Sequence, residues 1–227
     1  NRLFCSRDRF GEKPFYFMRR ADGFYFGSEI RQLLLMCDTR TADRDLLNRF
    51  LLGVVGDDVA DTFFHGIDKL PAGHNLTYVI AARRVPITRY FELTCDEEVA
   101  KAGFDENLER FRYLFEDSVS IRMRSDVKVG TCLSGGLDSS SISAFAAGMH
   151  RNDTSTKFSA ITAKSTEAVN DETHFAEMVV SHHDLNWIIS QPSYEDFAAT
   201  ISDVTAAQEE PFGSASIVMQ YHGMHAA

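Results

Sequence analysis

Residues 127–140 of this 227-residue chain read VKVGTCLSGGLDSS. The first half of this stretch is an almost continuous apolar run that ends at Leu133, which is typical of a strand covered on both faces of a sheet. Two adjacent glycines, Gly135 and Gly136, follow the run, and apolar residues then recur at helical spacing over residues 142–149. A buried strand, a glycine-containing bend and a helix in this order indicate a βα unit of an open parallel sheet.

The second half of the chain continues the alternation of strand and helix patterns. We expect strands at residues 158–163 and 185–190, and helices at residues 172–183 and 194–208. Strands and helices that alternate at this spacing predict a parallel sheet with right-handed crossover connections.

The first half of the chain has a different pattern. Aromatic runs at residues 15–17 and 24–26 are joined by a turn that contains Asp22 and Gly23, which predicts a β-hairpin. Further elements are expected at residues 2–5, 29–36, 76–81 and 88–91. A polar, acidic stretch begins at residue 96. The predicted organisation is a first domain over residues 1–95, a linker over residues 96–107 and a second domain over residues 108–227.

The composition excludes several classes of partner. Lys and Arg together number 23 against 33 for Asp and Glu, which gives a formal net charge of -10. The overall charge of such a chain does not attract nucleic acid or anionic membranes, and no apolar run approaches the ~18 residues of a membrane span. The four cysteines are scattered without a C-x-x-C pair, which predicts reduced thiols and a cytoplasmic location. We therefore expect small-molecule partners, no nucleic acid and no membrane.

Residues 134–140, which we call the glycine loop, carry the clearest chemical signal. Ligands of open α/β sheets bind beyond the carboxyl ends of the strands, where this loop is expected. Its glycines let the backbone approach a ligand, the next helix offers unpaired N–H groups, and Ser134, Ser139 and Ser140 add hydroxyl donors. This combination predicts a phosphate-binding site. Asp138 would repel a phosphate unless a Mg²⁺ ion lies between them, so Asp138 is the predicted metal ligand.

Other interpretations of the glycine loop can be compared with its residues. A Walker A loop would require Lys where Gly136 stands, and the adjacent glycines break a dinucleotide-binding fingerprint. A hydrolase nucleophile elbow would make Ser134 the nucleophile, but Cys132 stands where its first glycine belongs. Three alternatives stay open: a serine hydrolase, a non-catalytic protein that retains the loop, and a plain strand-to-helix turn capped by Asp138 or Ser139.

The glycine loop resembles the pyrophosphate-binding loop of the PP-loop ATP pyrophosphatases. Upstream, residues 7–16, 26–30 and 66–74 are similar to the closing segments of the glutaminase domain of glutamine-hydrolysing asparagine synthetases, and residues 209–216 also resemble members of that family. The resemblance implies a chain with α+β and α/β parts. The first would be the C-terminal part of an Ntn-type α/β/β/α glutaminase domain. The second would be the first half of a parallel-sheet PP-loop domain of the adenine nucleotide α-hydrolase type.

The resemblance also implies a reaction and a set of ligands. In that family glutamine supplies ammonia, aspartate attacks ATP to form aspartyl-AMP with release of pyrophosphate, and ammonia displaces AMP to give asparagine. The implied contacts are main-chain groups near Cys132, Leu133 and Ala160 for the nucleoside, the loop residues Ser134, Gly135, Gly136, Ser139 and Ser140 for pyrophosphate, and Asp138 for Mg²⁺. The implied small-molecule partners are ATP, glutamine and aspartate or another carboxylate. Assembly into a homodimer is an open alternative.

The chain also departs from the family pattern. Residue 1 is Asn where the glutaminase needs a nucleophilic cysteine, and the family's second ATP segment is not found, so we expect an inactive piece of a longer protein with no catalytic residue of its own. Gly213 stands where some members carry an Arg near the amino-acid pocket. The alternative within the resemblance is therefore a β-lactam or macrolactam synthetase. Glu209 and Glu210 are expected either at the amino-acid substrate or at a solvated helix end.

Overall fold

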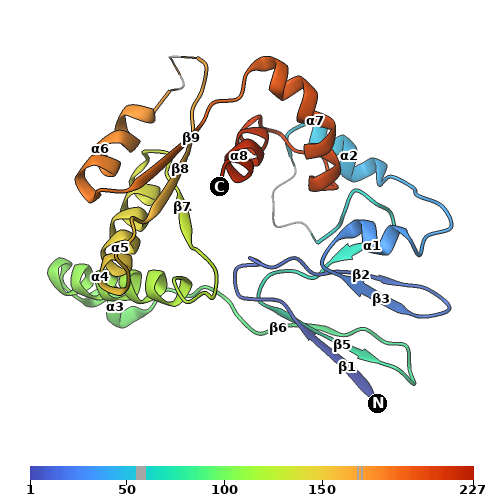
Figure 1. Cartoon of the computed structure of the whole chain (residues 1–227). Helices are drawn as coiled ribbons and strands as arrows, with labels where there is room; N and C mark the ends of the chain where they lie inside the picture. Colours follow the sequence, from blue (N-terminus) through green and yellow to red (C-terminus); the bar gives the residue numbers. More distant parts are fainter. Residues whose placement is uncertain (55–59, 168, 170) are drawn as a thin grey trace. The chain divides into compact units, whose positions relative to one another are not determined.

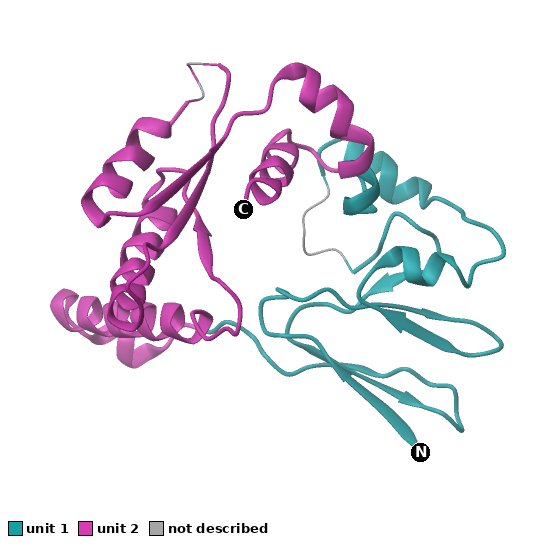
Figure 2. Cartoon of the chain, viewed as in Figure 1, with its two compact units in different colours: residues 1–94, 205–211 teal, residues 95–204, 212–227 magenta. Residues whose placement is uncertain are grey.

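The computed structural model describes residues 1–54, 60–167, 169 and 171–227. The chain divides into two compact units with mixed α and β structure, coloured separately in Figure 2. Unit 1 comprises residues 1–94 and 205–211, and unit 2 comprises residues 95–204 and 212–227.

The described residues of unit 1 form two small antiparallel sheets, two helices and the end of a third helix that begins in unit 2 (Figure 1). One sheet has the order β1 (Arg2–Ser6), β5 (His74–Val79), β6 (Ile87–Arg89), and the other has the order β3 (Phe24–Gly27), β2 (Tyr16–Arg19), β4 (Asp68–Lys69). The helices are α1 (Ile30–Leu34) and α2 (Arg44–Leu51). Strands β2 and β3 pair in antiparallel register around the turn that contains Asp22 and Gly23, so the predicted hairpin is confirmed.

Strand β2 is the centre of unit 1 because it is buried on both faces. Successive side chains of a strand point to opposite faces, and Phe17 and Met18 are both almost completely buried. Phe17 packs in a cluster with Cys5, Leu70 and Leu76, which joins its sheet to β1 and β5. Met18 packs in a second cluster with Ile30, Leu33 and Ile67, which holds α1. The order of layers is therefore sheet, sheet, helix.

Residues 205–211 belong to unit 1 although they lie far along the chain. The carboxylate of Glu209 accepts hydrogen bonds from the backbone N–H groups of Ile30 (2.7 Å) and Arg31 (2.9 Å), and its side chain is only 10% exposed. The carboxylate of Glu210 accepts from the N–H of Phe63 at 2.9 Å. The expectation of a solvated helix end was therefore wrong, because both carboxylates accept hydrogen bonds from backbone donors of unit 1; a contact with the amino-acid substrate stays a prediction.

Unit 2 contains a three-stranded parallel sheet and its helices (Figure 1). In chain order these are α3 (Glu97–Lys101), α4 (Phe104–Arg122), β7 (Gly130–Cys132), α5 (Leu137–Asp153), β8 (Ser159–Ala163), α6 (Thr173–His183), β9 (Asn186–Ser190), the start of α7 (Tyr194–Gln208) and α8 (Ser216–His225). The strand order is β7-β8-β9, and both strand pairs are parallel, as the alternating pattern predicts for the strand direction. Strand β7 is shorter than the expected 127–133, and residues 96–107 contain α3 and the start of α4.

The two faces of β8 carry different partners. Ala160 is fully buried in a cluster that includes Ala146 of α5 and Ala176 of α6. Its neighbour Ile161 faces the other way and lies against α8, where a Cβ added to Gly223 would be 3.7 Å from the Ile161 side chain. The sheet of unit 2 is therefore covered on both faces, which agrees with its apolar strands.

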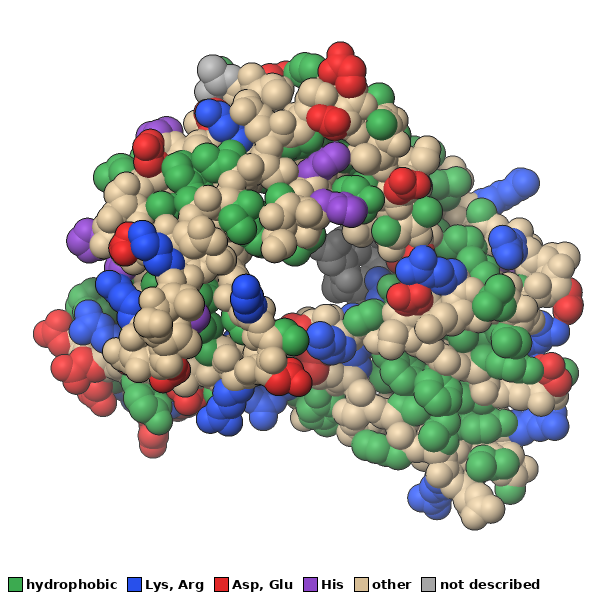
Figure 3. Space-filling view, viewed as in Figure 1, with side chains coloured by type: hydrophobic (Ala, Val, Ile, Leu, Met, Phe, Trp, Pro, Cys, Tyr) green, Lys and Arg blue, Asp and Glu red, His purple; other side chains and the backbone are tan. Residues whose placement is uncertain are grey.

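The surface of unit 2 carries the acidic character of the chain. Acidic side chains gather over α3 and α4 on the face shown in Figure 3. The first turns of these helices hold Glu97, Glu98, Asp105 and Glu106, where carboxylates oppose the positive end of the helix dipole. Among the helices of the described residues, none combines the length and apolar character needed to cross a membrane.

Candidate functional site

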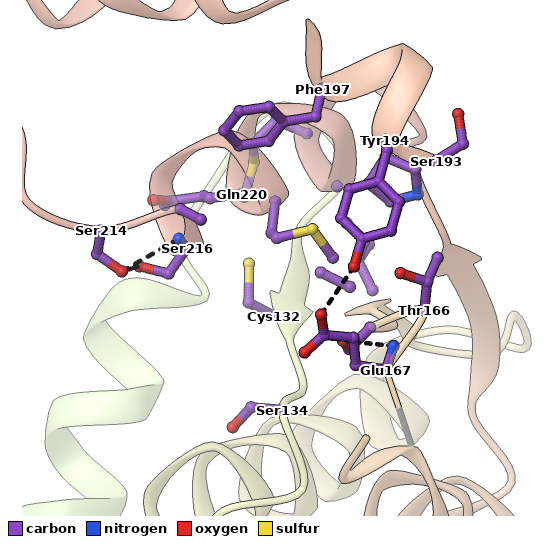
Figure 4. A pocket seen from close by; sticks show the side chains of 18 of the residues that line it. Cys132, Ser134, Thr166, Glu167, Ser193, Tyr194, Phe197, Ser214, Ser216 and Gln220 are labelled. Carbon is purple, nitrogen blue, oxygen red and sulfur yellow. Dashed lines mark hydrogen bonds between the residues drawn. The ribbon is translucent and has the colours of Figure 1, made fainter. Parts of the chain in front are cut away.

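A cavity of about 790 Å³ opens in unit 2 at the carboxyl ends of the three parallel strands (Figure 4). Ligands of open α/β sheets bind at this edge, and pockets for small molecules usually measure roughly 300–1,000 Å³. Its lining comes from the end of β7 and the residues after it (Cys132, Leu133, Ser134), from β8 and the residues after it (Ile161, Ala163, Ser165, Thr166, Glu167), from the start of α7 and the residues before it (Pro192, Ser193, Tyr194, Phe197) and from α8 and the residues before it (Ser214, Ala215, Ser216, Met219, Gln220, Gly223, Met224).

The glycine loop needs glycine strictly at one of its two positions. Gly135 has a φ of +93°, in the region that favours glycine. A Cβ at this position would lie 2.9 Å from the carbonyl oxygen of Glu172 and 3.0 Å from the backbone nitrogen of Ala176. Gly136 has an ordinary φ of -67° and caps the N-terminus of α5. The loop therefore passes directly against the first turn of α6, at a distance that only glycine allows.

Hydroxyl and backbone groups of the loop form one hydrogen-bonded cluster. The hydroxyls of Ser134 and Ser139 lie 3.0 Å apart, and the N–H of Gly136 donates to Ser134 Oγ at 3.3 Å. The N–H of Ser134 points at Ser139 Oγ (3.3 Å), whose hydroxyl reaches the carbonyl of Gly136 at 3.1 Å. Ser140 lies within the first turn of α5, where its N–H donates to the Gly136 carbonyl. These donors sit at a helix N-terminus, which suits an anion.

Asp138 is exposed in the first turn of α5. Within the described residues, no three side chains of His, Cys, Asp or Glu come together as a metal site. Mg²⁺ usually keeps several waters and is bound by one or two carboxylates together with phosphate oxygens of the substrate. A single exposed carboxylate within the loop therefore fits an ion that arrives with a nucleotide, and it does not fit a metal held by protein alone.

The residues expected to contact the nucleoside of ATP lie in different environments. Cys132 and Leu133 line the cavity, and partial burial raises the pKa of the Cys132 thiol, which keeps it neutral. The N–H of Leu133 already donates to the carbonyl of Ile161 at 2.8 Å. Ala160 lies in the core and does not line the cavity, whereas Ile161 and Ala163 do. Successive residues of a strand point to opposite faces, so the sequence position alone indicates that Ile161 and Ala160 face different sides of the sheet.

Sequence reasoning did not identify the far wall of the cavity. Tyr194 donates a hydrogen bond to Glu167 Oε1 at 2.7 Å, which raises the pKa of the Tyr194 hydroxyl, and both side chains are visible in Figure 4. Phe197, Met219 and Met224 supply apolar surface. These residues come from α7 and α8, and nothing local in the sequence indicates that α8 packs on β8. The cavity thus joins a polar loop to an apolar wall.

A nucleophile elbow would need a base beside Ser134. In the described part of the chain, the hydrogen-bond partners of Ser134 Oγ are Ser139 and Gly136, and neither is a base. The geometry therefore does not favour the hydrolase alternative.

Comparisons with known proteins match both halves of the chain. The family model described as asparagine synthase matches residues 110–227, and the model described as a glutamine amidotransferase domain matches residues 1–91. Asparagine synthetase [glutamine-hydrolyzing] 3 of Bacillus subtilis is 39% identical over 150 residues, which cover 65% of this chain and 24% of that protein. Putative asparagine synthetase [glutamine-hydrolyzing] 2 of Methanocaldococcus jannaschii is 31% identical over 220 residues, which cover 94% and 41%.

A relative with a different name also matches. Amidase chry2 of Gibberella zeae is 31% identical over 144 residues, which cover 62% of this chain and 20% of that protein. The chain thus spans less than half the length of each of these relatives.

The asparagine synthase model covers more than half of the chain and includes the whole glycine loop and the cavity beside it. The chain belongs to the asparagine synthase family.

Proposed function

We propose that this chain is part of a glutamine-hydrolysing asparagine synthetase, a carbon–nitrogen ligase, and that unit 2 holds its ATP. The observation that carries the proposal is the glycine loop at the edge of the cavity, with two serine hydroxyls and a helix N-terminus gathered at one point. The loop would bind the pyrophosphate portion of ATP, and the cavity would receive the nucleoside. The parallel sheet and this loop support a PP-loop domain of the adenine nucleotide α-hydrolase type.

The proposed reaction uses these groups for positioning and charge stabilisation. A carboxylate oxygen of aspartate attacks the α-phosphorus, the bond to the pyrophosphate oxygen breaks, and aspartyl-AMP forms; ammonia from glutamine then displaces AMP. Ser134, Ser139 and the N–H of Gly136 would donate to the departing pyrophosphate, whose negative charge grows in this step. Mg²⁺, held in part by Asp138, would supply further neutralisation of that charge.

We further propose that unit 1 is the C-terminal part of an Ntn-type α/β/β/α glutaminase domain. Its two stacked sheets with α1 on one side support this assignment, as does the glutamine amidotransferase match over residues 1–91. The predicted domain limits, the cytoplasmic location and a homodimer stay predictions.

Calorimetric titration of the whole protein that contains this chain with ATP, with and without Mg²⁺, tests the proposal. We expect Mg²⁺-dependent binding that pyrophosphate competes with. Asp138→Asn should weaken it by about tenfold or more, because contacts to charged groups contribute about 1.5–3 kcal/mol. Asp153→Asn, at the other end of α5, is the matched control and should bind like the original chain. Nucleotide binding that ignores Mg²⁺ and Asp138, or no binding at all, would refute the proposal.

The acceptor carboxylate is a separate question. The match to a protein named as an amidase and the glycine at position 213 favour testing substrates other than aspartate. Exchange of labelled pyrophosphate into ATP by the whole protein, with one carboxylate at a time, identifies the substrate: exchange with aspartate supports asparagine synthesis, and exchange only with another carboxylate supports a related amide-forming or lactam-forming ligase.

A further inference from the structure

A buried threonine connects the centre of the unit 2 sheet to the start of the glycine loop. The indole N–H of Trp187 in β9 donates to Thr162 Oγ1 at 2.8 Å. The Thr162 hydroxyl in turn donates to the backbone carbonyl of Leu133 at 2.8 Å. Thr162 is only 2% exposed and does not line the cavity. Since the hydroxyl accepts from one group and donates to the other, its proton has a fixed direction.

The Leu133 carbonyl that accepts from Thr162 belongs to the peptide bond between Leu133 and Ser134, the first residue of the glycine loop. A peptide bond is planar and trans, so the carbonyl of Leu133 and the N–H of Ser134 lie in one plane and point in opposite directions. Fixing the carbonyl therefore fixes the direction of the N–H. That N–H points at Ser139 Oγ, inside the cluster described above.

The rest of Leu133 is fixed as well. Its N–H donates to Ile161 at 2.8 Å and its side chain is buried in the core. The last free rotation before the loop is that of the Leu133–Ser134 peptide, and the Thr162 hydroxyl restrains it. A valine would fill nearly the same space without the cost of burying a hydroxyl. The two hydrogen bonds are what offset that cost at position 162.

We propose that Thr162 is a positioning residue for phosphate binding: its hydroxyl, held by Trp187, keeps the Ser134 N–H directed into the glycine loop. The proposal rests on the proposed nucleotide site, and Thr162 itself touches no ligand. Without the hydroxyl the Leu133 carbonyl loses its side-chain donor, the peptide can rotate, and the first N–H of the loop no longer points at Ser139 Oγ in the hydrogen-bonded cluster proposed to bind phosphate.

Three variants separate this role from simple core packing. Thr162→Val removes the hydroxyl and keeps the shape, and Thr162→Ser restores the hydroxyl without the methyl group. Val204→Ala, at a buried position of α7, is a control that lowers stability without touching the loop. Two quantities are measured for each folded variant: the exchange rate of the Ser134 amide by NMR without nucleotide, and the dissociation constant for ATP with Mg²⁺.

For Thr162→Val we expect about tenfold faster exchange at Ser134 and about tenfold weaker ATP binding, in line with the loss of one buried hydrogen bond. Thr162→Ser and Val204→Ala should stay within about threefold of the original chain in both measurements. Unchanged exchange and affinity in Thr162→Val, or the same losses in Thr162→Ser, would overturn the proposal. Faster Ser134 exchange in Thr162→Val, together with no nucleotide binding by the original protein, would instead refute the proposed function and the role in phosphate binding, and would leave only the restraint of the Leu133–Ser134 peptide by Thr162.

Discussion

Replacing Gly135 by alanine should destabilise unit 2 by about 2–5 kcal/mol. A residue other than glycine at a φ of +93° costs roughly 1–2 kcal/mol. The added Cβ would also lie 2.9 Å from the Glu172 carbonyl oxygen and 3.0 Å from the Ala176 nitrogen. Both atoms belong to the backbone at the start of α6 and cannot turn aside, so overpacking adds about 1–3 kcal/mol.

Urea unfolding followed by tryptophan fluorescence measures this loss. The chain has a single tryptophan, Trp187, which lies partly buried in β9 and therefore reports on unit 2. With a urea dependence of about 2 kcal/mol per molar, the urea concentration at the unfolding midpoint should fall by roughly 1–2.5 M. ATP binding should weaken as well, because relief of the contact requires the loop or α6 to move.

Gly136→Ala is the matched control one residue away. Gly136 has a φ of -67°, and an added Cβ would meet only the Ser134 hydroxyl at 3.4 Å. Alanine is a poorer helix N-cap than glycine, so we expect a loss of at most about 1 kcal/mol. Equal urea unfolding midpoints for Gly135→Ala and Gly136→Ala would show that the close approach of α6 does not make glycine necessary at position 135. That result would refute the reasoning.

Two further predictions concern unit 1. Glu209→Ala should speed amide exchange at Ile30 and Arg31, because each loses a charged acceptor at a cost of about 1–3 kcal/mol; unchanged exchange would contradict the capping role. The N–H groups of Lys13 and Glu12 hold the pKa of Asp8 at about 2, below its usual value. This stabilisation is present above the unfolded pKa of ~3.9 and is lost as pH falls toward 2, so Asp8→Asn should flatten the acid unfolding profile of unit 1 over that range; an identical profile would argue against it.

Local patterns predicted a large part of unit 2. The order of strands and helices, the parallel sheet and the bend at residues 134–140 all follow from periodicity and from the paired glycines. The strand before the loop proved shorter than its apolar run, because only Gly130–Cys132 pair with β8 in the ladder. Residues 127–129 have the composition of a strand but no partner in that ladder, and composition alone does not distinguish the two cases.

Contacts between distant residues could not be predicted in this way. The carboxylate of Glu209 reaches amides 179 and 178 positions earlier in the chain, and such a pairing leaves no periodic signal. The position of α8 on β8 is equally non-local, so no local pattern marks Met219 and Met224 as part of a cavity wall. The resemblance implies main-chain contacts near Ala160, which stay a prediction, and the structure adds that the Ala160 side chain faces the core.

Membership of residues 205–211 in unit 1 has a consequence for how the protein is made. During synthesis on a ribosome, the first 94 residues emerge long before the carboxylates that cap α1 and bond Phe63. The hydrogen bonding of unit 1 is therefore completed only after nearly all of unit 2 has been translated. For the same reason, a gene cut at the apparent boundary near residue 94 would yield a first piece that lacks two of its own hydrogen-bonding groups.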